Sequence, residues 1–218
     1  MKTAKISATG QEFPIGKIIC LARNYAEHAR ELGNETPTAP VLFMKPASSV
    51  IADGEAVRIP SYSQECHYEV ELAVLIGKQC RAVSAENARE YVAGYGTAID
   101  MTLRDVQNSL KSKGLPWEIA KGFDTACPLS DFVPAAAVAD PHNLRLRLAV
   151  NGALRQDGCS SDMINRVPQI IAHISAIFTL EPGDVILTGT PAGVGQVLAG
   201  DVMEAGIEGV SSIKITVE

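Results

Sequence analysis

The chain has 218 residues, of which 46% are hydrophobic and 20% are charged, and its formal net charge is −6. That length and composition suit one globular domain whose core needs no disulfide or metal to hold it together. The sequence has no basic stripe, no signal-peptide core and no apolar run near the roughly 20 residues of a membrane-spanning helix. These features argue against nucleic-acid and membrane partners and favour a soluble, cytoplasmic protein. The five cysteines include no C-x-x-C pair and are expected to be free thiols.

Short apolar or alternating runs bounded by turn residues predict strands along the whole chain. In chain order they cover residues 17–21, 41–44, 69–76, 144–150, 184–188 and 212–217. Asn151-Gly152 follows an alternating run and predicts a tight hairpin, because both residues tolerate a positive φ. Pro182-Gly183-Asp184 predicts a turn before the fifth strand.

Helical patterns are fewer, and four are predicted. They cover residues 22–32, 84–91, 102–113 and 165–178. Ser84 is expected to cap the second helix, and Thr102 with Asp105 has the spacing of a capping box for the third. Pro168 falls in the first turn of the fourth, where its missing N–H costs little. Strands outnumber helices and do not alternate with them, so the predicted fold class is α+β, predominantly β and mostly antiparallel.

Two glutamates and an aspartate form the main chemical signal. Glu69 and Glu71 are two apart on a predicted strand, so their side chains share one face and could meet at one cation. Asp100 ends the next apolar run and could supply a third oxygen ligand. A set of hard oxygen donors without histidine or cysteine favours Mg²⁺ or Mn²⁺, then Ca²⁺, over zinc. The alternative is a solvated edge strand with outward-facing glutamates.

Four other sites carry candidate residues. His28 and Glu31 share a helix face and could form a general base oriented by a carboxylate, or an ordinary surface pair. Lys45 and Lys121 sit among apolar and small residues, as anion-binding, catalytic or merely snorkelling lysines do. The Gly-rich loop 188–195 lacks the ending of a P-loop, yet its amides and the Thr190 hydroxyl could hold a carboxylate if it is more than a tight turn.

Several of these stretches, taken together, resemble the fumarylacetoacetate hydrolase family, and most closely its short acylpyruvase and oxaloacetate decarboxylase branch. The matching stretches occur in family order from about residue 16 to the C-terminus, so the ordered set is specific although each piece alone is weak. They are residues 22–28 (ARNYAEH), 41–46 (VLFMKP), 68–72 (YEVEL), 100–107 (DMTLRDVQ), 114–117 (GLPW), 120–124 (AKGFD), 150–152 (VNG) and 187–195 (LTGTPAGVG).

The resemblance implies a mixed β-sandwich roll, a homodimer and one Mg²⁺ or Mn²⁺ per subunit. It implies one catalytic domain over residues 1–218, with residues 1–15 as an N-terminal lead-in and a lid helix at about residues 22–33. The family's metal ligands fall on Glu69, Glu71 and Asp100.

The resemblance also assigns catalytic and substrate-binding residues. His28 and Glu31 match the dyad on the lid helix, and Lys121 matches the catalytic lysine. The residues assigned to substrate binding are Arg23, Lys45, Arg104, Gln107 and Thr190.

The function that follows as an expectation is hydrolysis of the C–C bond of acylpyruvates of the fumarylpyruvate or acetylpyruvate type, giving pyruvate and a carboxylic acid. The presence of both His28 and Glu31 favours it, since hydrolysis needs an activated water. The alternative on the same metal site is an oxaloacetate decarboxylase or keto–enol isomerase, which needs no attacking water. A non-catalytic binding module would predict missing ligands or a missing dyad, and none is missing.

Overall fold

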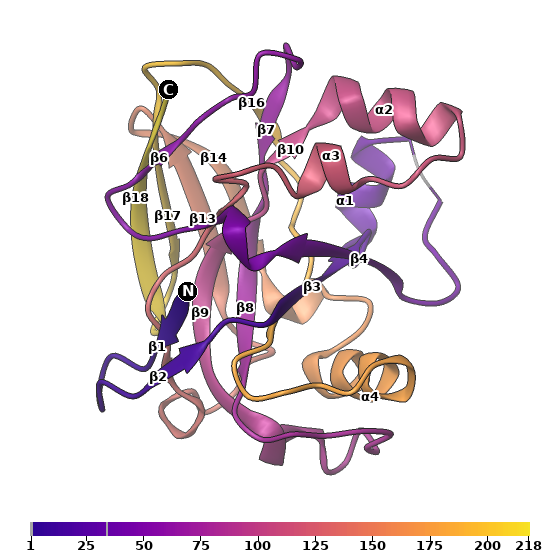
Figure 1. Ribbon diagram of the computed structural model, residues 1–218, viewed down its shortest axis with the longest axis vertical. Coiled ribbons are helices and arrows are strands. Elements are labelled where there is room, and N and C mark those ends of the chain that lie inside the picture. The colour runs from indigo at the N-terminus through magenta and orange to yellow at the C-terminus, as the bar shows by residue number, and fades with distance from the viewer. Residues whose placement is uncertain (1, 34) are drawn as a thin grey trace.

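Two β-sheets packed face to face form the body of the protein (Figure 1). The computed structural model describes residues 2–33 and 35–218. The larger sheet has the strand order β12-β9-β8-β15-β3-β4, and only the β15–β3 pair is parallel. Its strands are β12 (Val133–Pro134), β9 (Val92–Ile99), β8 (Val70–Ile76), β15 (Val185–Leu187), β3 (Lys17–Ala22) and β4 (Val41–Pro46).

The second sheet has the order β14-β13-β17-β18-β6, and only the β18–β6 pair is parallel. Its strands are β14 (Ala153–Cys159), β13 (Arg145–Val150), β17 (Val202–Ile207), β18 (Ser211–Val217) and β6 (Ala56–Val57). In β18 the odd-numbered residues from Ile213 to Val217 are buried and Lys214 is exposed, as the two-residue period of a strand with one wet face requires.

Strand β8 is buried along its whole length because both of its faces are covered. Leu72 and Val74 enter the core shared with the second sheet, whereas Ala73 and Leu75 enter a second core on the opposite face. The second core is closed by the hairpin of β1 (Thr3–Lys5) and β2 (Glu12–Pro14), which lies in the segment that the resemblance implied as an N-terminal lead-in. A strand held on both sides is a rigid support for any residue at its ends.

Two small sheets complete the architecture. One joins β10 (Thr102–Leu103), β7 (Cys66–Tyr68) and β16 (Gly195–Val197), and the other pairs β11 (Cys127–Pro128) with β5 (Val50–Ile51).

The helices are short and lie at the periphery. Figure 1 shows α1 (Ala26–Glu31), α2 (Arg104–Ser112) and α3 (Glu118–Lys121) gathered on one side, apart from α4 (Val167–Ile177). In the described residues three 3-10 turns, Ala47–Ser49, Ala88–Tyr91 and Ala135–Ala137, link strands, and a fourth, Ser160–Asp162, lies between β14 and α4. In the part of the chain that the structure describes, no helix has the length and apolarity needed to cross a membrane.

The fold-class prediction is confirmed, and so are all six predicted strands to within a few residues, although the run 69–76 breaks at Glu69 between β7 and β8. The Asn151-Gly152 hairpin is confirmed as well, with φ values of 51° and 78°.

The helix predictions were less accurate. The predicted helix 22–32 begins only at Ala26, because β3 continues to Ala22 and Arg23 turns the chain with φ at 59°. The predicted helix 84–91 is only the 3-10 turn Ala88–Tyr91, with Asn87 rather than Ser84 at its start. The capping box at Thr102 is wrong, since Thr102 and Leu103 pair as β10 with His67 and Cys66 and α2 starts at Arg104 without a side-chain cap.

Candidate active site

Three buried carboxylates meet where β8 and β9 come together. These strands are antiparallel with Val70 opposite Ile99, so Glu69 at the start of one lies beside Asp100 at the end of the other. The backbone N–H of Asp100 donates to the carbonyl of Glu69 at 2.8 Å. Glu71 follows two residues later on the same face, and one carboxylate oxygen from each residue lies within 4.8 Å of the other two. All three residues are at most 4% exposed.

Lys121, the last residue of α3, reaches into this cluster. Its ammonium donates to Glu69 Oε2 at 2.9 Å, to Asp100 Oδ2 at 2.6 Å and to Thr102 Oγ1 at 2.6 Å. Its Nζ also lies 4.9 Å from the centre of the Phe43 ring. The position of the Lys121 ammonium is therefore fixed by Glu69, Asp100 and Thr102.

Arg104, the first residue of α2, is a second basic residue at this cluster. The three carboxylates with Lys121 and Arg104 are called the floor below. One guanidinium nitrogen pairs with Glu69 and another donates to Gln107 Oε1 at 2.6 Å. Because Arg104 and Gln107 are three residues apart on the helix, both side chains leave it on the same face.

The protonation equilibria of the carboxylates differ because their partners differ. Burial opposes ionisation of Glu69, but Lys121 and Arg104 outweigh it and hold the pKa of Glu69 well below its usual value. Burial, followed by the charges of Asp100 and Glu69, raises the pKa of Glu71 well above its usual value. For Lys121 burial is outweighed by Asp100 and Glu69, so its pKa is raised.

The donor set fits a hard divalent cation. Three carboxylates, buried and within reach of one ion, repel one another unless positive charge lies among them. Glu71 is exposed to that repulsion, because it lies beside Asp100 and Glu69, and its Oε2 accepts a hydrogen bond from the backbone N–H of Gly189 at 2.6 Å. Oxygen ligands alone match Mg²⁺ or Mn²⁺.

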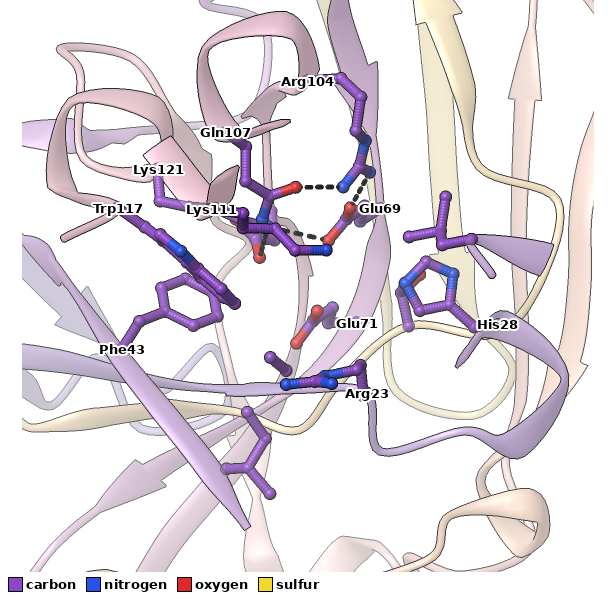
Figure 2. A pocket seen from close by; sticks show the side chains of 15 residues that line it. Arg23, His28, Phe43, Glu69, Glu71, Arg104, Gln107, Lys111, Trp117 and Lys121 are labelled. Carbon is purple, nitrogen blue, oxygen red and sulfur yellow. Dashed lines mark hydrogen bonds and ion pairs between the residues drawn. The ribbon is translucent and has the colours of Figure 1, made fainter. Parts of the chain in front are cut away.

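A pocket opens above these carboxylates, as Figure 2 shows. Nine of the residues singled out from the sequence line it, namely Arg23, His28, Glu69, Glu71, Asp100, Arg104, Gln107, Lys121 and Thr190. The structure thus brings together residues that span more than 160 positions of the chain.

Lys45, which the family resemblance assigned to substrate binding, does not line this pocket. The side chain is 0% exposed and lies behind Asp100, with Nζ 2.7 Å from Asp100 Oδ1. The same ammonium donates to the carbonyls of Met101 at 3.1 Å and Ala126 at 3.0 Å, and to that of Lys121. Lys45 supports the floor from the protein side.

His28 and Glu31 lie together on α1, above the pocket. His28 Nδ1 is 3.4 Å from Glu31 Oε2, and the His28 side chain is only 6% exposed. Glu31 does not line the pocket. Its two carboxylate oxygens instead accept from the backbone N–H of Gly193 at 3.1 and 3.2 Å, so Glu31 also ties α1 to the Gly-rich loop.

The Gly-rich loop holds a carboxylate of the protein itself. Gly189 has a φ of 93° and binds Glu71 through its backbone N–H. The Thr190 hydroxyl donates to the carbonyl of Val70 at 2.8 Å and accepts from Gln156 Nε2 at 2.9 Å. This loop therefore fixes the position of the glutamate strand.

Sequence reasoning missed several lining residues. Phe43 and Trp117 form an aromatic wall with ring centroids 6.0 Å apart, and Lys111 lies at the rim (Figure 2). Trp117 is part of a stretch that carried the family resemblance, so the signal for it was present. Lys111 had none, because an exposed lysine on a helix is the usual pattern of a solvated face.

Comparisons with known proteins identify the family of this chain. The family model described as fumarylacetoacetate (FAA) hydrolase C-terminal matches residues 17–218, and the chain belongs to the fumarylacetoacetate hydrolase family. It is 54% identical over 201 residues to the mitochondrial oxaloacetate tautomerase FAHD1 of Bos taurus, covering 92% of this chain and 91% of the relative. It is 48% identical over 199 residues to the oxaloacetate tautomerase YcgM of Escherichia coli K12, covering 91% of each.

A solved structure of a fumarylpyruvate hydrolase has the same fold as this chain. The crystal structure of fumarylpyruvate hydrolase from Pseudomonas aeruginosa in complex with Mn²⁺ and pyruvate matches with a TM-score of 0.95 and 38% identity. The match covers 99% of this chain and 95% of the other.

Proposed function

We propose that this protein is an oxaloacetate tautomerase, an enzyme that interconverts the enol and keto forms of oxaloacetate with the help of Mg²⁺ or Mn²⁺. The observation that carries the proposal is the meeting of three buried carboxylates with Lys121 at the floor of a pocket rimmed by basic side chains. The tautomerases similar to this chain over more than 90% of its length support this reaction over hydrolysis, which the sequence alone had favoured.

Glu69, Glu71 and Asp100 would hold the metal. A divalent cation in such a site supplies Lewis-acid polarisation of a 2-oxo acid and orients it. Lys121, which lines the same pocket, would stabilise the negative charge that grows on the C2 oxygen as the C3–H bond breaks, and its ammonium could donate a proton to that oxygen. Arg104 and Gln107 restrain Glu69 and the wall next to it.

The proton at C3 needs a second group, and we assign it to His28. Glu31 lies at the Nδ1 side of the ring, which leaves Nε2 for the pocket. His28 would take the C3 proton to form the enol and return it to form the ketone, while the closed α1 excludes bulk water. Hydrolysis of an acylpyruvate would use the same base on a water molecule.

The test follows enol oxaloacetate by its ultraviolet absorbance as it decays to the ketone. The proposal expects the purified protein with Mg²⁺ to accelerate the decay, and expects a chelator or the Glu71→Gln substitution to abolish the acceleration. Acceleration that survives both treatments would contradict the metal assignment, and no acceleration by the Mg²⁺-loaded protein would contradict the proposed function.

A second candidate is acylpyruvate hydrolysis, favoured by the His28–Glu31 pair over the pocket and by the likeness to fumarylpyruvate hydrolase. Release of pyruvate from fumarylpyruvate and acetylpyruvate, beside release from oxaloacetate by decarboxylation, separates the three activities. In a hydrolase His28→Ala should abolish hydrolysis, whereas decarboxylation should partly survive.

The organisation of the assembly stays a prediction. We propose one catalytic domain over residues 1–218, with α1 as a lid, assembled as a homodimer in the cytoplasm. Light scattering on the purified protein tests the dimer.

A further inference from the structure

The pocket has more basic side chains than those that contact its carboxylates. The acidic residues among its described lining residues are Glu69, Glu71 and Asp100, and three basic groups, Lys45, Lys121 and Arg104, contact two of them directly. Two further basic side chains, Arg23 and Lys111, line the same pocket. A pocket with this surplus attracts an anion with more than one negative charge.

Arg23 is directed to the pocket by an uncommon backbone conformation. It follows β3 directly and has a φ of 59°, which residues other than glycine seldom adopt. Such strain persists where the surroundings enforce it, often at functional sites. Here the next residue, Asn24, is buried and donates through Nδ2 to the carbonyls of Thr188 at 2.8 Å and Asn165 at 3.0 Å.

The Arg23 guanidinium itself makes no hydrogen bond or ion pair within residues 2–33 and 35–218. The strained turn therefore places a positive group at the pocket without using it to hold the protein together.

Lys111 reaches the pocket from the opposite side. It lies seven residues after Arg104 and four after Gln107 on α2, so the three side chains leave one face of the helix. In Figure 2 the Arg23 and Lys111 side chains extend toward the middle of the pocket from opposite sides, above and below Glu71. Partial burial, then the charges of Arg23 and Arg104, lowers the pKa of Lys111, as expected where like charges converge.

We propose that Arg23 and Lys111 form a subsite for the distal carboxylate of a 2-oxo diacid, and so select diacids over 2-oxo monoacids. The inference rests on the proposed function, because the 2-oxo acid end must lie at the Glu69–Glu71–Asp100 floor. In oxaloacetate one methylene separates the keto carbon from the second carboxylate, which places that carboxylate toward the rim. A guanidinium binds a carboxylate through two parallel hydrogen bonds, and an ammonium adds a point charge.

Matched substrates test the subsite. 2-Oxobutyrate is oxaloacetate with a methyl group in place of the distal carboxylate, and its enolisation is measured by exchange of the C3 protons for deuterium in NMR spectra. We expect Arg23→Met and Lys111→Met each to lower the ratio of kcat/KM for oxaloacetate to that for 2-oxobutyrate by about 10- to 100-fold. Arg23→Lys should recover part of the ratio.

The control is Lys113→Met, which removes a positive charge from an exposed residue at the end of the same helix, outside the pocket. It should leave the ratio within about twofold of the wild-type value. A fall as large as those in the other variants would show that overall charge selects the diacid, and would overturn the subsite. Equal losses on both substrates in Arg23→Met and Lys111→Met would overturn it too.

Binding provides a readout that does not depend on turnover. L-Malate and 2-hydroxybutyrate differ by the same carboxylate-for-methyl exchange, and calorimetry on the Mg²⁺-loaded protein gives their affinities. The wild-type protein should bind malate at least about tenfold more tightly, and Arg23→Met and Lys111→Met should remove that preference. Equal wild-type affinities would overturn the subsite. If oxaloacetate is not tautomerised at all, the proposed function fails, while calorimetry still decides the subsite.

Discussion

The floor and the rim of the pocket are built in opposite ways. At the floor Asp100 and Lys45 are both at most 1% exposed and are bound by several short contacts from different segments of the chain. At the rim Lys111 is exposed, and Glu31, whose side chain is 34% exposed, lies 3.4 Å from His28 on the same helix and joins α1 to the Gly-rich loop through the N–H of Gly193. The same pocket thus has buried ion pairs at its floor and more exposed side chains at its rim.

The difference teaches where each kind of function resides. Charges fixed in a dry site act strongly on developing charge and need no rearrangement during the reaction, so the floor suits chemistry. A rim with few contacts can open, close and adapt, so it suits substrate admission and selection. Substitutions at the floor should therefore change stability, metal binding and kcat, whereas substitutions at the rim should act through substrate binding and proton transfer.

The largest expected effect is at Glu71. Glu71→Gln should lower kcat/KM on the order of 1000-fold or more, since it removes a metal ligand. Because the carboxylate is buried beside Asp100 and Glu69, its removal should also stabilise the metal-free protein, by about 2–4 °C in Tm for each 1 kcal/mol gained. Thermal unfolding with and without Mg²⁺ measures both effects. A variant whose Tm still rises with Mg²⁺ as the wild type does would break the assignment of Glu71 to the metal.

Lys45→Met comes next and tests the support of the floor. It leaves Asp100 Oδ1 buried without its ion pair, so urea unfolding should show a loss of about 3–5 kcal/mol. Lys17→Met is the matched control, because the buried Asp184 that pairs with Lys17 keeps hydrogen bonds from the backbone N–H groups of Lys17 and Glu181, and it should lose only about 1 kcal/mol. Equal losses would mean that the loss at Lys45 does not come from an unpaired Asp100 Oδ1.

Substitutions of His28 and Glu31 on α1 should lower kcat without changing the affinity for Mg²⁺. His28→Asn should lower kcat by about 100-fold or more, the usual contribution of a positioned general base. Glu31→Gln keeps an oxygen for the Gly193 N–H but removes the charge beside His28, so a loss of about tenfold is expected. Calorimetric affinity for Mg²⁺ should stay within about twofold in both variants. Loss of Mg²⁺ binding in either variant would show that α1 contributes to the metal site. It would contradict the division of functions between floor and rim.

The sequence predicted the floor well because its signals are local or carried by ordered family stretches. The spacing of Glu69 and Glu71 on a strand placed both carboxylates on one face, and the turn after β9 supplied Asp100. The broad fold was also accessible, since alternation and turn residues mark antiparallel strands.

What the sequence could not predict depends on long-range contacts. Lys45 follows an apolar run that suggests a wall residue, and only the packing of β4 behind Asp100 shows that the ammonium faces away from the pocket. Thr102 has the spacing of a helix cap, yet pairing with His67 overrides that local preference. The sequence paired Glu31 with His28 through their helix spacing, whereas its second partner lies 162 residues away, at Gly193.

The smallest expected effect is at Asp105, where α2 joins the body of the protein. Its carboxylate accepts from Ser63 Oγ at 2.6 Å and from the backbone N–H groups of Gln64 and Val106 at 2.8 Å each. Partial burial opposes ionisation, but these hydrogen bonds outweigh it and lower the pKa of Asp105. A carboxyl group whose pKa is lower in the folded than in the unfolded chain stabilises the fold above the unfolded value of about 3.9, and that stability is lost as the pH falls through the folded value. Asp105→Asn should therefore lose about 1 kcal/mol at pH 7, and the deficit should shrink in acid. Urea unfolding at pH 7 and in acid measures this loss of unfolding free energy, and a loss that does not depend on pH would assign the effect to packing.

Asp105 also anchors the helix that carries Arg104 to the floor and Lys111 to the rim. In Asp105→Asn, kcat and KM should each change by no more than about twofold. A larger change in kcat would show that the floor depends on this anchor, and a larger change in KM would show that the rim does.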